Sequence, residues 1–195
     1  MRLLGLFFVT VVIISCSSNQ GTLEDYANFP VKFAKQKITY PNNDFTVCIP
    51  KNWNWKVEDY NNDHIILGIG AGSEPDKDGF IDFITIQKVK CFGGKNDLKS
   101  EYDYLLNLTK QQSNGMKIVE TGETDMLHQT AYFFHSKSET NTYGESEMIC
   151  FVLEGDLEGT FYYLNAGASQ TKNFKRNMAI LLHSLKTFEI HKTKS

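Results

Sequence analysis

The chain has 195 residues and a formal net charge of −3, and 41% of its residues are hydrophobic and 22% charged. These values fit a single globular domain with a tail, large enough to bury a core that is stable by itself. No stripe of Lys or Arg is visible, so nucleic acid is not expected as a partner.

The first sixteen residues have the pattern of a secretory signal. An apolar region from Leu3 to Ile14 is too short to span a bilayer but suits the core of a signal peptide. The sequence Ile13-Ile14-Ser15-Cys16 resembles a bacterial lipobox. The resemblance implies a signal peptide over residues 1–15 and lipidation of Cys16, with palmitate among the acyl chains that hold the protein on the membrane. The alternative is an ordinary secretory signal with an incidental cysteine.

The residues after the cysteine suggest a location and a tether. Ser17, not Asp, follows Cys16, which in the usual lipoprotein sorting pattern implies the outer membrane, with the domain in the periplasm. Residues 16–36 are expected to form the lipidated N-terminus and a tether, because the segment from Ser17 to Gly21 is polar and unpatterned. We expect part of the tether to pack on the domain, since it also carries the apolar residues Leu23, Tyr26, Phe29, Val31 and Phe33.

Both tryptophans of the chain lie between Asp44 and Val57. Apolar and polar residues alternate with period two before Pro50 and again after it. This pattern predicts two strands of an antiparallel sheet, the first of which ends at the proline. We expect this stretch to be the nucleus of the sheet, with Trp53 buried between the sheet and a helix.

The remaining elements follow in the order strands, helix, strands, helix. Asn96 or Asp97 can cap a helix from Leu98 to about Ser113, and a second helix is predicted from about Thr171 to Leu185. Residues Phe80–Val89 are apolar on both faces, which predicts a central strand. Other predicted strands are Lys37–Tyr40, His64–Ile69, Met116–Glu123, Thr130–Ser138, Glu145–Leu153 and Thr160–Ala168, with a loop at Gly70–Gly79.

This order predicts an α+β fold, an antiparallel sheet with helices packed on it. Three features stand out: Phe45-x-Val47-x-Ile49-Pro50-x-x-Trp53, the strand Phe80–Val89 before a helix, and the closing sequence Leu182-His183-Ser184-Leu185-Lys186-Thr187-Phe188. They resemble the PsbP/DcrB-like fold, an α-β-α sandwich of photosystem extrinsic proteins and bacterial lipoproteins. The resemblance implies one domain over residues 37–190, a tail over 191–195 and no shared catalytic residues. A lipocalin-like β-barrel with a C-terminal helix is the alternative fold.

Three motifs each fall short of the chemistry that they suggest. Gly68-Ile69-Gly70-Ala71-Gly72-Ser73 lacks the spacing of a phosphate-binding loop. Glu74-Pro75-Asp76-Lys77-Asp78-Gly79, continued by Asp82, resembles a calcium loop but has Thr85 where the bidentate Glu belongs. Gly144-Glu145-Ser146-Glu147-Met148 is one glycine short of a nucleophile elbow.

The histidines and cysteines show no metal-binding or catalytic spacing. His135, on a predicted strand, is expected to be packed or surface-exposed and not a base. In an oxidising envelope one pair of Cys48, Cys91 and Cys150 could bridge and leave the third free. No catalytic residue, metal or cofactor is expected. The other histidines are His64, His128, His183 and His191.

The sequence thus predicts a non-enzymatic, membrane-anchored envelope lipoprotein with a binding or scaffold role toward a protein or other envelope partner. The alternative is a hydrolase or small-ligand-binding lipoprotein with a cleft that the sequence does not reveal. A deep pocket joining His, a carboxylate and Ser or Cys would favour the alternative. A shallow surface with an exposed aromatic patch would favour the binding role.

Overall fold

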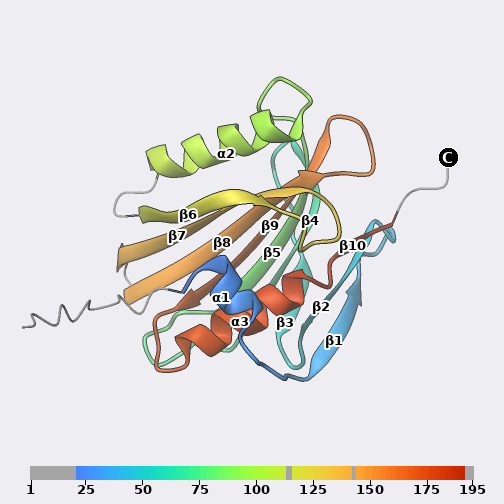
Figure 1. Ribbon diagram of the computed structural model, residues 1–195. Coiled ribbons are helices and arrows are strands. Elements are labelled where there is room, and N and C mark those ends of the chain that lie inside the picture. The colour runs from blue at the N-terminus through green and yellow to red at the C-terminus, as the bar shows by residue number, and fades with distance from the viewer. Residues whose placement is uncertain (1–20, 113–115, 142–143, 192–195) are drawn as a thin grey trace, which may run out of the picture.

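Seven strands form an antiparallel sheet through the middle of the molecule (Figure 1). The computed structural model describes residues 21–112, 116–141 and 144–191. The strand order is β3-β4-β5-β9-β8-β7-β6, so β3 and β6 are the edges. The strands are β3 (Asn54–Val57), β4 (Ile65–Gly72), β5 (Phe83–Lys90), β6 (Met116–Thr124), β7 (Ala131–Asn141), β8 (Gly144–Glu154) and β9 (Thr160–Ser169).

Helices and a small second sheet cover the two faces of this sheet (Figure 1). Helix α2 (Leu98–Gln112) packs on one face. On the other face lie α1 (Leu23–Ala27), α3 (Phe174–Leu185) and a sheet in the order β1-β2-β10. The strands of the small sheet are β1 (Lys35–Thr39), β2 (Phe45–Pro50) and β10 (Glu189–Ile190).

The central strands are buried on both faces. On β8, Ile149 and Phe151 point toward α3, while Cys150 and Val152 point toward α2, and none of the four is more than 1% exposed. Because successive side chains alternate between faces, a strand covered on both sides is apolar at nearly every position. Strand β5 lies between β4 and β9, which confirms the predicted central strand.

The two long helices begin differently. At the start of α2, Asp97 Oδ1 accepts a hydrogen bond from the backbone N–H of Ser100 at 2.8 Å, which caps the helix as predicted. Helix α3 begins at Phe174, later than predicted, because the backbone before it forms a turn in which Phe174 N–H donates to Thr171 O at 3.0 Å. None of the described helices is long and apolar enough to cross a membrane.

The stretch around the two tryptophans is not the nucleus of the sheet. Strands β2 and β3 do not pair, and they belong to different sheets. Between them Asn52 adopts a positive φ of 71°, which turns the chain from one sheet to the other. All four residues of β3 are exposed, and Trp53 is only half-buried against the core. Period-two alternation predicts strands correctly but does not say which strands pair.

Two further expectations are corrected. The loop predicted at Gly70–Gly79 starts later, because β4 continues through Gly72. Within the described residues the large sheet is open, ending at β3 and β6, so the lipocalin-like barrel is wrong. The predicted α+β fold with helices on an antiparallel sheet is confirmed.

Candidate functional site

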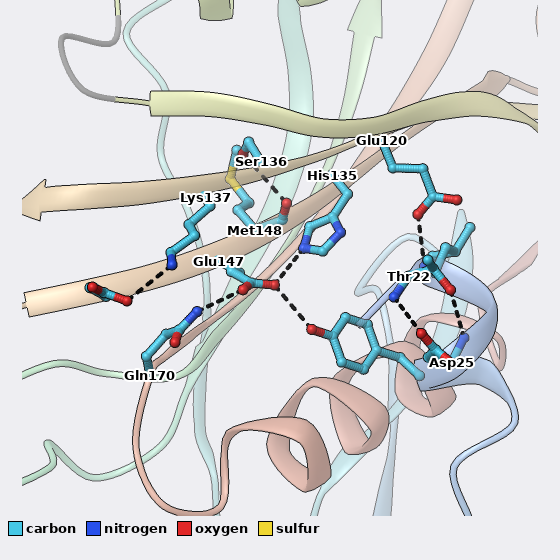
Figure 2. Close-up of polar contacts among 12 residues, drawn as sticks. Thr22, Asp25, Glu120, His135, Ser136, Lys137, Glu147, Met148 and Gln170 are labelled. Carbon is cyan, nitrogen blue, oxygen red and sulfur yellow. Dashed lines mark hydrogen bonds and ion pairs between the residues drawn. The ribbon is translucent and has the colours of Figure 1, made fainter. Parts of the chain in front are cut away.

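Glu147 is the centre of a buried polar cluster (Figure 2). Its Oε2 atom lies 2.7 Å from Nε2 of His135 and accepts a hydrogen bond from the Tyr26 hydroxyl at 3.0 Å. Its Oε1 atom accepts a hydrogen bond from Nε2 of Gln170 at 2.7 Å. His135, Glu147 and Tyr26 are each at most 2% exposed. A carboxylate this deeply buried requires such donors, because burial without them is strongly unfavourable.

The register of two neighbouring strands brings this cluster together. On β7 and β8, His135 lies opposite Ile149 and Lys137 lies opposite Glu147. His135 and Glu147 are therefore diagonal neighbours on one face of the sheet, the face that carries α1 and α3. The sequence singled out His135 and, within the motif of residues 144–148, Glu147, but it did not predict that they pair, because a hairpin separates them.

Helix α1 closes the cluster from outside. Its first turn is held by a capping box, in which Asp25 N–H donates to Thr22 Oγ1 at 3.1 Å and Thr22 N–H donates to Asp25 Oδ2 at 2.9 Å. Leu23 N–H donates to Glu120 Oε2 on β6 at 2.8 Å. The side chains of Leu23 and Tyr26 are buried, so this part of the expected tether belongs to the core.

The cluster has groups that could move protons, but it is closed to a substrate. Burial, reinforced by the charge of Glu147, raises the pKa of Tyr26 far above its ordinary value, so the phenol stays protonated and donates. The rings of Tyr26 and His135 pack edge to face, with centroids 5.8 Å apart. Because Tyr26, His135 and Glu147 are buried and only Gln170 is exposed, we assign the cluster the task of holding α1 on the sheet.

Two other buried polar groups also join elements. Glu101 on α2 accepts hydrogen bonds from the backbone N–H groups of Phe92 and Gly93, at 2.9 and 2.8 Å, and from the Tyr163 hydroxyl on β9. Lys88 on β5 lies 2.5 Å from Asp156 Oδ1 and 3.3 Å from Asp44 Oδ1. The first group fixes α2 to the large sheet. The second fixes the large sheet to the segment that enters β2.

The acidic motif of residues 74–79 forms a turn. Asp76 Oδ1 accepts hydrogen bonds from the N–H groups of Asp78 and Phe80, both at 2.9 Å, and Oδ2 accepts one from Ser169 Oγ at 2.7 Å. The Ser169 hydrogen bond lowers the pKa of Asp76. Asp82 instead accepts from Asn177 on α3, and burial raises its pKa. Across the described residues, no group of three His, Cys, Asp or Glu is arranged to hold a metal ion.

The remaining candidate residues lie apart from one another. The thiols of Cys48, Cys91 and Cys150 are free, and burial strongly raises the pKa of Cys150. His64 stacks on Phe92 with centroids 4.3 Å apart. The expected lipidation residue, Cys16, lies outside the described residues.

An open apolar groove lies along the β3 edge of the large sheet, and we call it the edge groove. Its volume is about 380 Å³, and Gly70 and Gly72 on β4 form part of its lining. Trp55 and Ile81 line it with 40% and 44% of their surfaces exposed, and Val57 nearby is 43% exposed. Within the described chain β3 pairs only with β4, so its other side has no strand partner. Sequence reasoning found Trp55 but expected it to lie in the sheet nucleus.

A second hollow, of about 400 Å³, lies between the turn after β6 and strand β10. Its polar residues are His128, Gln129, Asp156 and Glu189. Asp156 is held by Lys88, and no Ser, Thr or Cys is among the described residues that line the hollow. Among its described lining residues the hollow therefore has no hydroxyl or thiol nucleophile beside its histidine.

No protein-family model and no curated protein matches the sequence. Solved structures with the same fold include the cyanobacterial PsbP protein CyanoP of Synechocystis sp. PCC 6803, at 9% identity and a TM-score of 0.57 over 83% of this chain and 95% of that chain. The Ran-binding protein Mog1p of Saccharomyces cerevisiae matches at 13% identity and a TM-score of 0.54, over 82% and 96% of the two chains. LpqN of Mycobacterium tuberculosis matches at 14% identity and a TM-score of 0.51, over 89% of this chain and 99% of that chain.

These likenesses cover nearly the whole length of each solved chain. They confirm the PsbP-like fold that the sequence motifs predicted. At such low identities they establish the fold alone.

Proposed function

We propose that this chain is a non-enzymatic, membrane-anchored lipoprotein of the bacterial cell envelope, and that its domain binds a protein partner at the edge groove. The observation that carries the proposal is that two large apolar side chains, Trp55 and Ile81, line this open groove while 40% and 44% of their surfaces are exposed. Exposed apolar surface that lines a groove marks an interaction site more often than a single exposed side chain does. The charged residues in the lining, Lys56 and Glu58, are paired with each other at 3.2 Å, so the rest of the groove suits apolar side chains of a protein.

Two observations support the anchored, envelope part of the proposal. Ile13-Ile14-Ser15-Cys16 resembles a lipobox, and Ser17 fits sorting to the outer membrane with the domain in the periplasm. LpqN, which shares the fold, is involved in cell envelope biogenesis. The Ran-binding protein Mog1p illustrates that this fold can present a protein-binding surface.

The hydrolase alternative gains no support from the geometry. The His135–Glu147 pair is buried beneath α1, and the hollow that contains His128 has no hydroxyl or thiol nucleophile among its described lining residues. A binding module therefore fits the buried polar groups better than a hydrolase does, because these groups form hydrogen bonds that join one element to another.

Site-specific photocrosslinking in native membranes tests the proposal. A photoreactive residue placed at Lys56 or Ile81, which both line the groove, should yield one discrete crosslinked protein, and Trp55→Ser should abolish it. The matched control is Leu157, which is 57% exposed but lies in the turn after β8, away from the groove. Equal yields at Leu157 and at the groove, or no crosslink at either groove position, would contradict the assignment of the groove.

A further inference from the structure

We propose that the outward surface of α3, together with the segment 28–35 beside it, rests on the anionic surface of a lipid bilayer. We call this surface the basic face. It carries six basic side chains: Lys32, Lys35, Lys172, Lys175, Arg176 and Lys186. The inference deepens the proposed function and rests on it, because it uses the anchor at Cys16.

The first argument is the length of chain between the anchor and the fold. Only five peptide links separate Cys16 from Gly21, so covalent geometry limits their separation to about 18 Å. Gly21 is itself fixed in the structure, since a Cβ there would lie 2.6 Å from Cε1 of Tyr26. The hydrogen bond from Tyr26 to Glu147 and the burial of Leu23 then hold α1 in place. The domain therefore lies close to the bilayer, with α1 on its near side.

Contacts place the basic face beside that point of entry. The Lys175 ammonium lies 5.7 Å from the centroid of the Phe29 ring, and the Lys35 ammonium lies 5.0 Å from that of Phe33. The pKa of His183 on α3 is lowered mainly by burial and further by the positive charges of Lys186 and Lys35, so both lysines lie near this side chain. Phe29 and Phe33 are half-buried, so the face combines cations with partly exposed aromatic rings. That combination suits the headgroup region of a bilayer.

The charges distinguish this face from the neighbouring end of the sheet. At the end of the sheet where β6 and β8 begin and β7 ends, Lys117 is paired with Glu139 at 2.8 Å and Lys137 with Glu145 at 3.1 Å. No cation of the basic face forms an ion pair in the described part of the chain. Acidic neighbours are few. Asp25 lies in the capping box of α1 and within electrostatic reach of Lys175, Asp76 and Asp82 are hydrogen-bonded to Ser169 and Asn177, and Glu24 is exposed. In a chain of net charge −3, this face is the one that complements anionic lipid.

The orientation leaves the edge groove accessible. Ile84 and Ile86 on β5 face the core beneath α3, so Phe83 and Thr85, which line the groove, point to the α2 side of the sheet. With the basic face on the membrane, the groove and α2 are turned toward the aqueous space, where a partner can reach them.

Amine-reactive footprinting of the mature acylated protein tests the inference without any mutation. The protein is reconstituted in phosphatidylcholine vesicles with or without phosphatidylglycerol, and lysine labelling is compared with that in detergent. Lys172 and Lys175 should be labelled about fivefold more slowly in the anionic vesicles, which corresponds to about 1 kcal/mol per lysine at an anionic surface. The exposed Lys95 and Lys110, which lie just before α2 and on it, should be unaffected.

A charge-reversal pair provides the matched control. Lys175→Glu with Arg176→Glu should restore labelling of Lys32 and Lys35 in anionic vesicles, whereas Lys95→Glu with Lys110→Glu should not. Three results would contradict the assignment of the basic face to the membrane. They are slower labelling of Lys117 and Lys137 in place of Lys172 and Lys175, equal protection of Lys172 and Lys175 in neutral and anionic vesicles, and no protection of any lysine. The mass of the N-terminal peptide separates this failure from failure of the anchor: without acyl chains on Cys16, the proposed function fails first.

Discussion

The Tyr26 hydroxyl donates to a carboxylate that is almost completely buried, and it does so from a helix of only five residues. So short a helix is not stable alone. Its position depends on the two side chains that it contributes to the core and on the hydrogen bond to Glu147. At the scale of single residues, therefore, this bond is one of the few contacts that make the N-terminal segment part of the fold.

Removing that hydroxyl should measurably loosen the domain. Tyr26→Phe keeps the ring but leaves Glu147 one donor short, and hydrogen bonds to charged groups contribute about 1.5–3 kcal/mol. We expect the free energy of unfolding, measured by urea denaturation, to fall by that amount. Tyr104→Phe, which changes a partly exposed tyrosine on α2, should alter it by less than about 0.5 kcal/mol. Equal effects of the two variants would contradict the role of the bond.

The buried cluster was only partly predictable. In β8, Glu147 is in phase with Ile149 and Phe151, which face the core. A charged residue at a core-facing position is a signal that it has buried partners. The partners themselves could not be predicted, because Tyr26 was expected only to pack on the domain as part of the tether, and the pairing of His135 with Glu147 depends on the register of a hairpin.

At the scale of elements, strong periodicity determined what could be predicted. Strands β6 to β9 and both long helices begin and end within a few residues of their predicted bounds, because each has a continuous apolar pattern. The tryptophan stretch misled because large aromatic residues suggest burial, whereas β3 is a short edge strand. The edge groove could not be predicted, since it arises where α2 stops covering the sheet.

The two tryptophans should differ in their effect on stability. Trp53 packs beside Pro50, Ile180 and Leu181, so Trp53→Ala should lower the free energy of unfolding by about 2–3 kcal/mol, less than for a fully buried Trp. Trp55 is 40% exposed, so Trp55→Ala should cost less than about 1 kcal/mol. Chemical denaturation measures both. A larger loss for Trp55 would mean that it is part of the core and not of a binding surface.

At the scale of the whole molecule, burial of tyrosine sets an alkaline limit. Burial raises the pKa of Tyr26, Tyr162 and Tyr163 far above the usual value near 10. The unfolded chain releases these protons above about pH 10 while the folded chain keeps them, so the stabilising contribution is complete below about pH 10 and declines above it. Above about pH 10, each of these three tyrosines should lower the free energy of unfolding by about 1.4 kcal/mol per pH unit.

The urea midpoint should therefore be level near neutral pH and fall steeply above about pH 10. Tyrosinate absorbance at alkaline pH should rise in two stages, with the three buried tyrosines ionising only as the chain unfolds. A single smooth titration of all nine tyrosines in a folded protein would contradict their burial.

Anchoring is also a property of the whole chain. If Cys16 carries the acyl chains, Cys16→Ala should abolish lipidation and move the protein from the membrane to the soluble fraction, because acyl chains supply about 0.8 kcal/mol per buried CH₂ group. Fractionation and mass spectrometry measure this. Recovery of the unmutated protein as a soluble species with its N-terminus elsewhere would contradict the lipoprotein proposal.

The incorporation of α1 into the core has a consequence for proteolytic shedding. A protease that cuts between Cys16 and Gly21 would release an intact domain, because every contact of Leu23 and Tyr26 would survive. A cut just after Ala27 would take α1 away with the anchor and open Glu147 and His135 to water. Cleavage before Gly21 would therefore release a folded domain, whereas cleavage a few residues later, after Ala27, would release a destabilised domain that is prone to degradation.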